Sequence, residues 1–234
     1  MMNAEQKKEI KEIFLDKIKP IPYLISKEYD FLKRYESLME IALTICPGFK
    51  ISDEEKKIYE NAIRYFSGDP SGEFNIKRGL YLYGRIGNGK SLFFKIFSAL
   101  NTGCYLGNDF NIFTISDLID GVGRDGFKFF SSAGITLNDG PLIMARSNRY
   151  WSRHILIDDI GQSVSSVKYF GSEINVVRDF FQRRYNAYSD HSALTHVATN
   201  VLPEKIKQEY GEFISSRMRE MFNIILFPGE DKRK

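Results

Sequence analysis

The 234-residue sequence contains few cysteines and histidines, and it has no apolar run long enough to cross a membrane. Two cysteines are too few for a disulfide framework or for a four-ligand zinc site. The three histidines show no metal-ligand spacing, so structural or surface positions are expected for His154, His191 and His196. The first residues also lack the apolar segment of a secretory signal. We therefore expect a cytoplasmic protein whose thiols are reduced and which does not contact a membrane.

The overall charge gives little indication of a partner. The formal net charge of +3 is too small to indicate nucleic-acid binding by itself, so any such role must depend on local clusters. A hydrophobic content of 43% and a charged content of 27% are typical of a globular chain. The length allows one substantial domain with a small appendage.

One segment fits a phosphate-binding motif at every fixed position. The run Gly79–Tyr83 alternates like a strand, the apolar stretch after Lys90 is typical of a helix, and the residues between them match G-x-x-x-x-G-K-[ST]. Backbone N–H groups of such a loop surround a phosphate, while the lysine reaches the β- and γ-phosphates and Ser91 binds Mg²⁺. A chance match in a glycine-rich turn is disfavoured by the strand–loop–helix context. The predicted ATP-binding residues are Gly84, Arg85, Ile86, Gly87, Asn88, Gly89, Lys90, Ser91 and Leu92.

An acidic segment further along the chain completes the predicted metal site. The apolar run His154–Ile157 reads as a buried parallel strand, and Asp158 and Asp159 follow it directly. Asp158 is expected to hold Mg²⁺ together with Ser91. Asp159 is expected to orient or deprotonate the attacking water.

The strand predicted at Leu194–Thr199 ends next to the amide of Asn200. The carboxyl ends of parallel strands meet at one edge of the sheet, which places this amide beside the phosphate loop. Asn200 is therefore a candidate for positioning water against a γ-phosphate.

Residues 1–76 are predicted to be a helical N-terminal segment, and residues 77–234 the nucleotide-binding domain. Amphipathic helices are expected over residues 10–18, over residues 31–45 and after Ser52, where Glu55 has capping-box spacing. The segment is either a helical bundle packed on the nucleotide domain or a docking module for another protein. The pattern favours packing for residues 10–18 and leaves the remainder open.

Residues 121–150 combine basic and aromatic side chains. This combination suits single-stranded DNA, because bases stack on aromatic rings while phosphates pair with cations. The candidate contacts are Arg124, Lys128, Arg146 and Arg149, near an aromatic cluster of Phe127, Phe129 and Phe130. An ordinary insertion with a small aromatic core and a solvated basic rim fits the residues equally well.

The remaining pattern predicts the fold class. A long helix is expected over residues 171–188, two further helices over residues 203–210 and 213–222, and a fifth strand over residues 223–227. Strands that alternate with helices indicate an α/β protein, here a five-stranded parallel P-loop sheet flanked by helices. An N-terminal helical segment precedes this sheet, and no C-terminal lid is expected after it.

From Gly79 onward the sequence resembles the AAA+ ATPases of the DnaC/IstB type, which are replicative helicase loaders and transposition helpers. Beyond the phosphate loop and the paired aspartates, the residues that carry the resemblance lie in 169–185, 195–200 and 210–223. These segments look like the versions found in phages, plasmids and other mobile elements. The resemblance implies ATP and Mg²⁺ as cofactors, a replicative helicase as partner, single-stranded DNA as a ligand of residues 121–150, and an ATP-dependent homo-oligomer.

The same resemblance implies roles for individual residues. Asn200 matches the position that senses the γ-phosphate, and Arg217 matches the arginine that a neighbouring subunit inserts into the ATP site. Arg219 competes for that role, and a plain surface arginine is the alternative for Arg217. Asp159 stands where many members have Glu, so slow hydrolysis is expected. Without a lid, Arg233 is only a faint candidate for a second arginine at the site.

The sequence is compatible with three other functions. One is a transposition helper that binds duplex DNA, and another is a nucleotide-dependent switch that barely hydrolyses ATP. The third is a small-molecule or nucleotide kinase, which would need an acceptor pocket and an arginine-rich lid that the sequence does not indicate.

Overall fold

The computed structural model describes residues 30–101, 110–136, 154–161, 166–169 and 171–232. The helix predicted at residues 10–18, together with Arg146, Arg149 and Arg233, lies outside these ranges. In chain order the elements are α2 (Phe31–Ile45), α3 (Asp53–Phe66), β1 (Gly79–Tyr83), α4 (Lys90–Asn101), β2 (Asn111–Thr114), α5 (Ile115–Asp125), α6 (Lys128–Ser132), β3 (Ile155–Ile160), β4 (Ser166–Tyr169), β5 (Ser172–Asn175), α7 (Val176–His191), β6 (Thr195–Thr199), α8 (Pro203–Tyr210), α9 (Glu212–Met221) and β7 (Phe222–Leu226).

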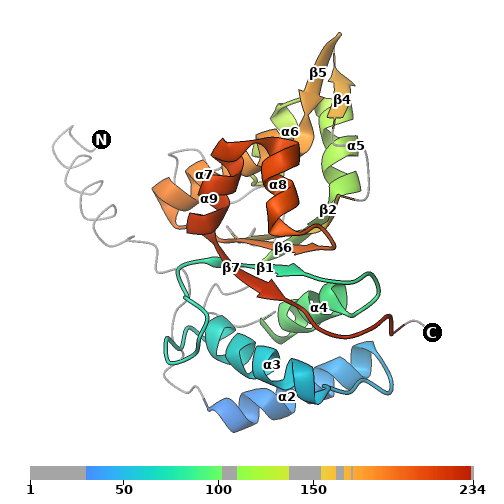
Figure 1. The fold of residues 1–234 in the computed structure, drawn as a ribbon, viewed down its shortest axis with the longest axis vertical. Helices are drawn as coiled ribbons and strands as arrows, with labels where there is room; N and C mark the ends of the chain where they lie inside the picture. Colours follow the sequence, from blue (N-terminus) through green and yellow to red (C-terminus); the bar gives the residue numbers. More distant parts are fainter. Residues whose placement is uncertain (1–29, 102–109, 137–153, 162–165, 170, 233–234) are drawn as a thin grey trace, which may run out of the picture.

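Five of the strands form one parallel sheet in the order β2-β3-β6-β1-β7. Helices α2, α3 and α4 cover one face of this sheet, and α5 to α9 lie over the other (Figure 1). The predicted five-stranded parallel sheet with flanking helices is confirmed. After β7 the described chain continues to Lys232 without another helix.

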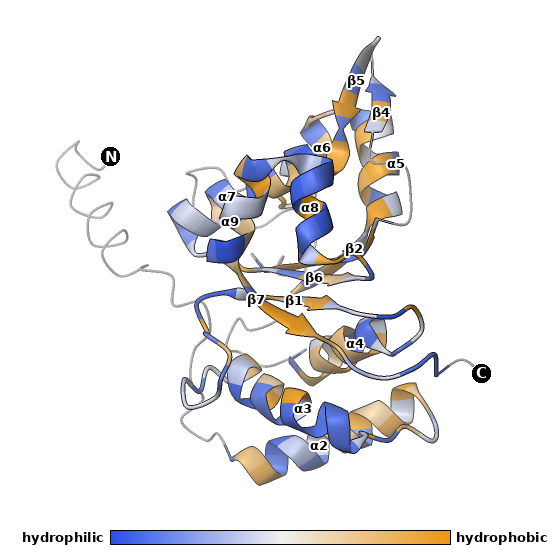
Figure 2. Cartoon of the chain, viewed as in Figure 1, coloured by the Kyte–Doolittle hydropathy of each residue, from blue (hydrophilic) through white to orange (hydrophobic). Residues whose placement is uncertain are grey.

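Each face of the sheet has its own hydrophobic core, because successive strand side chains point to opposite sides. Tyr81 of β1 packs toward α7 and α9, whereas Leu80 and Leu82 pack toward α3 and α4. Figure 2 shows the sheet as mostly hydrophobic, with hydrophilic residues on the outer faces of the helices. Among the described helices, none is long and apolar enough to span a bilayer.

The helices α2 and α3 pack on the five-stranded sheet through an aromatic cluster. Tyr59 of α3 contacts Phe93 and Phe97 of α4, with ring centroids 5.1 and 6.2 Å apart. Its ring also lies 6.4 Å from that of Phe227, which follows β7. Burying one such side chain stabilises the fold by about 1.5–3 kcal/mol. The core of this face is therefore shared by the N-terminal helices, the sheet and the segment after β7.

The predicted start of α3 is confirmed. The Glu55 carboxylate accepts hydrogen bonds from the backbone N–H of Ser52 at 3.0 Å and from its hydroxyl at 2.9 Å. These contacts satisfy one of the donors that a helix start leaves unpaired. The side chain of Glu55 is buried.

The helix predicted from Gly171 is wrong at its beginning, because residues 172–175 form strand β5. This strand pairs antiparallel with β4, and the hairpin extends away from the sheet (Figure 1). The helix α7 starts only at Val176, where the Asn175 side chain accepts from the N–H of Arg178 at 3.0 Å. The buried residue Ile174 therefore belongs to a strand and not to the apolar face of a helix.

Arg184 is completely buried and holds the start of β6 to α7. Its guanidinium donates to the Thr195 hydroxyl at 2.9 Å and to the carbonyls of Leu194 at 2.9 Å and Ile135 at 3.2 Å. Burial lowers the pKa of Arg184 to about 9. The arginine thus satisfies buried carbonyls of two segments, the one after α6 and the α7–β6 connection.

Candidate nucleotide-binding site

The candidate site lies where the carboxyl ends of β1, β3 and β6 meet. The phosphate loop follows β1, Asp158 and Asp159 lie near the C-terminal end of β3, and Asn200 follows β6. A cavity of about 1260 Å³ opens beside them, and its lining includes Lys90, Ser91, Asp158, Asp159 and Asn200. This volume is ample for a nucleotide. The fold therefore brings together the side chains predicted for a triphosphate site, apart from those of Arg85 and Arg217.

Lys90 is held against the loop that it follows in the motif. Its ammonium donates to the carbonyls of Gly84 at 3.0 Å and Arg85 at 2.7 Å, and to the side-chain oxygen of Asn88 at 2.9 Å. Gly87 has a φ of +80°, which favours glycine. The loop thus keeps a buried positive charge next to its own backbone.

Asn88 also connects the phosphate loop to the chain after β7. Its amide donates to the carbonyl of Phe227 at 2.7 Å, and the residue is fully buried. The Arg85 side chain points to solvent and pairs with Glu230 at 3.9 Å. Leu92 lines the cavity, whereas Gly84 and Arg85 contribute only the carbonyls that hold Lys90.

Ser91 at the start of α4 is in direct contact with Asp158 of β3. The Ser91 hydroxyl donates to a carboxylate oxygen of Asp158 at 3.1 Å. Burial raises the pKa of Asp158, the Asp159 charge adds to the rise, and the Ser91 hydrogen bond opposes it. A hydroxyl and a carboxylate supply the oxygen donors that Mg²⁺ prefers, with phosphates completing its coordination. The residues therefore fit the predicted metal.

Asp159 occupies an irregular position at the end of β3. The register of β3 with β6 shifts between Asp158 and Ile160, so Asp159 is an extra residue in the strand, and its φ is +63°. Its backbone N–H donates to the Asp158 carboxylate at 3.0 Å. Such a bulge turns a side chain away from the strand alternation, which here places both aspartates at the cavity.

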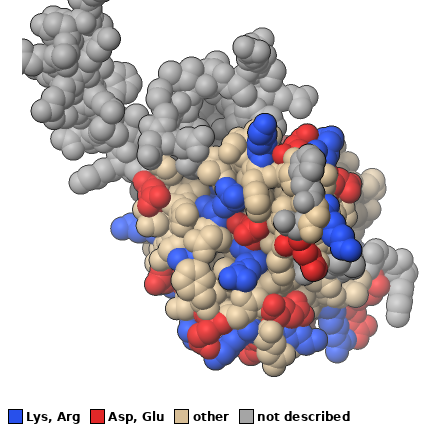
Figure 3. Space-filling model, turned by 90° about the horizontal axis from the view of Figure 1, so that it is seen from above, with Lys and Arg blue, Asp and Glu red and all other residues tan. Residues whose placement is uncertain are grey.

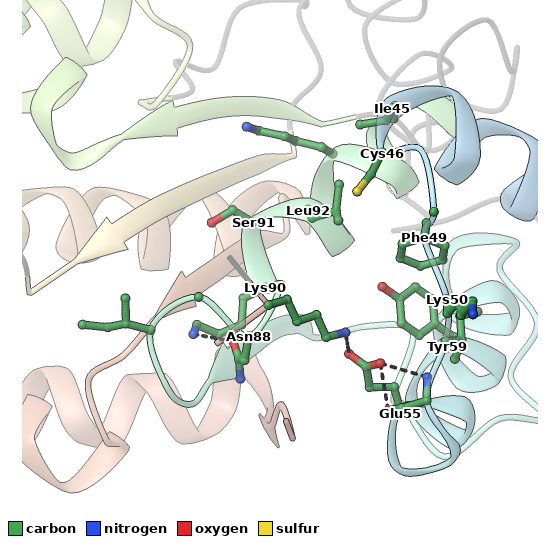
Figure 4. Close-up of a pocket in the computed structure, with 18 of the residues that line it drawn as sticks. Ile45, Cys46, Phe49, Lys50, Glu55, Tyr59, Asn88, Lys90, Ser91 and Leu92 are labelled. Atoms are coloured by element: carbon green, nitrogen blue, oxygen red, sulfur yellow. Dashed lines mark hydrogen bonds and ion pairs between the residues drawn. The ribbon is translucent and has the colours of Figure 1, made fainter. Parts of the chain in front are cut away.

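Two parts of the cavity wall were not predicted from the sequence. Residues of the α2–α3 connection and of α3 form one part, and Lys232 after β7 forms the other. In Figure 4, Phe49 and Tyr59 lie on the opposite side of the cavity from Asn88 and Ser91 of the phosphate loop. Burial raises the pKa of Tyr59, so its phenol stays neutral. An aromatic wall beside a phosphate loop suits a flat heterocycle.

Arg217 is not part of the cavity lining. Its guanidinium lies over the rings of Phe213 at 3.5 Å and Tyr185 at 4.2 Å, and it donates to the side chain of Gln182. Arg219 is exposed and pairs with Glu212 at 3.9 Å. The structure thus places Arg217 on the outer side of the α7–α9 pair, apart from the other predicted site residues.

The described part of the basic and aromatic segment has a small core. Phe130 is fully buried, Phe127 is 46% exposed, and the Arg183 guanidinium lies over both rings at 4.9 and 5.2 Å. Arg124 and Lys128 are exposed, and Arg124 pairs with Asp125 at 3.0 Å. Figure 3, which views this end of the molecule, shows both signs of charge interspersed.

Solved structures share this fold. DnaI matches with a TM-score of 0.55 and 17% identity over 83% of this chain and 93% of its own. A proposed primosome component from Streptococcus pyogenes serotype M3 matches with a TM-score of 0.53 and 15% identity over 89% and 100%. The DnaC helicase loader matches with a TM-score of 0.50 and 16% identity over 78% and 95%. No protein-family model and no curated protein matches the sequence.

The chain therefore shares the α/β fold of DnaI and of the DnaC helicase loader, as predicted. The likeness extends over most of each matched chain. At such low identity it establishes the architecture, whereas the chemistry must be argued from the residues of this site.

Proposed function

We propose that this protein binds ATP with Mg²⁺ and hydrolyses it slowly, as a helicase-loader type of AAA+ ATPase. One observation carries the proposal: Ser91 of the phosphate loop contacts Asp158 of β3 at 3.1 Å, beside Lys90, Asp159 and Asn200 on one cavity. These residues lie at or just after the ends of three strands. The contact between Ser91 and Asp158 is the arrangement that a nucleotide–metal complex requires.

Each residue then has a chemical role. Lys90 offsets phosphate charge, and Ser91 and Asp158 would hold Mg²⁺, whose charge would stabilise the phosphates. Asp159 accepts a proton from water as the water oxygen bonds to the γ-phosphorus. The bond from that phosphorus to the β,γ-bridging oxygen breaks, which gives ADP and inorganic phosphate. Asn200 orients the water or the γ-phosphate by hydrogen bonding.

The nucleotide proposal is tested with Lys90→Ala. We expect the affinity for ATP to fall by at least tenfold, because a charge-assisted contact to phosphate is lost. Titration with a fluorescent ATP analogue measures the affinity, and circular dichroism checks the fold. Lys56→Ala serves as control, since Lys56 is exposed on α3 and does not line the cavity. Tight ATP binding by Lys90→Ala would disprove the assignment.

We further propose a replicative helicase as the protein partner, since one of the matched structures is a helicase loader and another a proposed primosome component. The N-terminal segment, residues 1–76, is the proposed contact region. Tagged full-length protein, incubated with ATP, should retain a replicative helicase from the same cell. Retention of a transposase instead would support the alternative of a transposition helper.

Single-stranded DNA is the proposed nucleic-acid ligand. Its support is the exposed ring of Phe127 beside the exposed side chains of Arg124 and Lys128. Arg146 and Arg149 belong to the same proposal from sequence alone. Single-turnover ATP hydrolysis with and without single-stranded DNA separates an active ATPase from a switch that binds ATP without cleaving it.

A further inference from the structure

The segment after β7, Phe227–Lys232, is attached to the phosphate loop along its length. The N–H of Phe227 donates to the carbonyl of Tyr83 at 2.7 Å, and the N–H of Lys232 donates to the carbonyl of Gly87 at 3.0 Å. The fit is close, because a Cβ on Gly87 would lie 2.0 Å from a carboxylate oxygen of Asp231. This segment, called the C-terminal strap below, cannot move independently of the loop.

The strap also carries a lysine into the nucleotide cavity. The Lys232 ammonium lies 2.5 Å from a carboxylate oxygen of Glu55, and both residues line the cavity with the phosphate loop. A Cβ built on Gly89 would lie 3.9 Å from this ammonium, which places the charge next to the loop backbone. In Figure 4, dashed lines connect Glu55 to the groups that it contacts.

The two partners of this ion pair differ in their freedom to move. The Glu55 side chain is 1% exposed and is fixed by two hydrogen bonds from Ser52, while the Lys232 side chain is 41% exposed. A lysine has a long flexible stem and a compact charge, so its ammonium can change partners without moving the backbone. Glu55 keeps its two Ser52 contacts when the lysine leaves.

We propose that Lys232 is a nucleotide-binding residue whose ammonium exchanges Glu55 for the phosphate chain of the bound nucleotide, with Glu55 as the residue that positions it. The inference rests on the proposed ATP binding and adds a second lysine to the site. A polyphosphate carries several charges and therefore competes well with one carboxylate. Glu55 competes with the phosphates for the Lys232 ammonium, so it lowers the affinity for the nucleotide.

This exchange gives the two variants opposite effects on affinity. Lys232→Met should weaken the binding of fluorescent ATP and ADP analogues about fivefold, because a half-exposed charge contact is lost. Glu55→Gln should strengthen it by a similar factor, because the competitor is neutralised while the glutamine oxygen still accepts from Ser52. In the double variant the gain should vanish and the affinity should equal that of Lys232→Met. Lys56→Met is the matched lysine-to-methionine control, on the helix α3 that also carries Glu55.

A purely structural ion pair predicts something different. Both single variants would then lower the melting temperature and would change nucleotide affinity in the same direction or not at all, and either result overturns the proposal. Tight binding by the parent protein with no effect of either variant refutes this inference alone. Failure of the parent to bind nucleotide would refute the proposed function itself.

Discussion

Asp159 has a left-handed backbone, with a φ of +63° in a strand bulge. Aspartate tolerates this region better than most residues, but holding it there still costs about 1 kcal/mol. The hydrogen bond from its N–H to the Asp158 carboxylate fixes the turn. The bulge therefore places two adjacent carboxylates at one cavity, which a regular strand would direct to opposite faces.

Asp159→Asn separates binding from hydrolysis. Asparagine also adopts the left-handed conformation, so the bulge and the metal-holding pair should persist. We expect ATP affinity to stay within about twofold, while the rate of phosphate release falls by about 100-fold, as when a general base is lost. Asp190→Asn, an exposed change on α7, is the control. Unchanged phosphate release by Asp159→Asn would assign the proton transfer to another group.

Residue identity made the phosphate loop predictable from sequence. Backbone wrapping of a phosphate requires glycines at fixed positions, the Lys90 position accepts only lysine, and the Ser91 position accepts only serine or threonine. The aromatic wall of the cavity was not predictable in this way. Phe49 and Tyr59 satisfy the same apolar pattern as any core residue, and only the packing of α3 beside α4 brings them to the cavity.

At the level of elements, α7 and α9 together hold Arg217. The guanidinium stacks on Phe213 and Tyr185 and donates to Gln182. These contacts hold the arginine side chain on the outer side of the helix pair. Each stacking contact is worth about 0.5–1 kcal/mol at an exposed site. We propose that the triphosphate bound by a second copy of this chain competes with these contacts for Arg217.

Mixing two inactive variants tests whether Arg217 acts in a neighbouring subunit. Arg217→Ala should bind ATP normally and lose most of its ATPase activity, since a charge at the developing phosphate is removed. Added Lys90→Ala protein keeps Arg217 but lacks a working site, and we expect it to restore activity to Arg217→Ala. Phosphate release measures the rescue, and sizing with ATP or ADP measures the assembly. The assignment would be contradicted if a mixed oligomer forms without rescue. It would also be contradicted if Arg217→Ala is fully active while Arg219→Ala is inactive.

The β4–β5 hairpin shows why the remaining elements were harder to predict. Its strands have only four residues each, too few for alternation to be distinctive. Ile174 also stands three residues before Val177, so it continues the helical repeat of α7 backward. The pattern therefore predicts a first turn of helix where the structure has strand β5. Long buried strands such as β3 gave a clear signal, because both of their faces are apolar.

For the whole molecule, stability depends on pH through a buried histidine. His196 lies in β6, is fully buried among aromatic rings, and its Nδ1 accepts from the N–H of Leu80 at 3.1 Å. Burial lowers the pKa of His196 well below 6.5, and the neighbouring charges of His154 and Arg184 act in the same direction. The unfolded chain therefore binds a proton below pH 6.5 that the folded chain does not bind.

The sign follows from this difference in proton binding. The free energy of unfolding should fall as the pH drops below about 6.5, by up to about 1.4 kcal/mol per pH unit from this residue. Urea unfolding at pH 7.5, 6.5 and 5.5 measures the effect. His196→Gln should be less stable at pH 7.5 but should show a flatter pH dependence, whereas the half-exposed control His191→Gln should keep the parent slope. Equal slopes in all three proteins would contradict the role of His196.

The Ser91–Asp158 contact joins residues that are 67 positions apart in the chain. An unfolded chain holds no such pair, so a nucleotide that needs both residues binds the folded state alone. Under the proposed function, ATP would stabilise the folded state as well as being the substrate, and at a concentration 100 times its dissociation constant it would add about 2.7 kcal/mol to the free energy of unfolding. The amount of folded protein in the cell would thereby follow the supply of nucleotide.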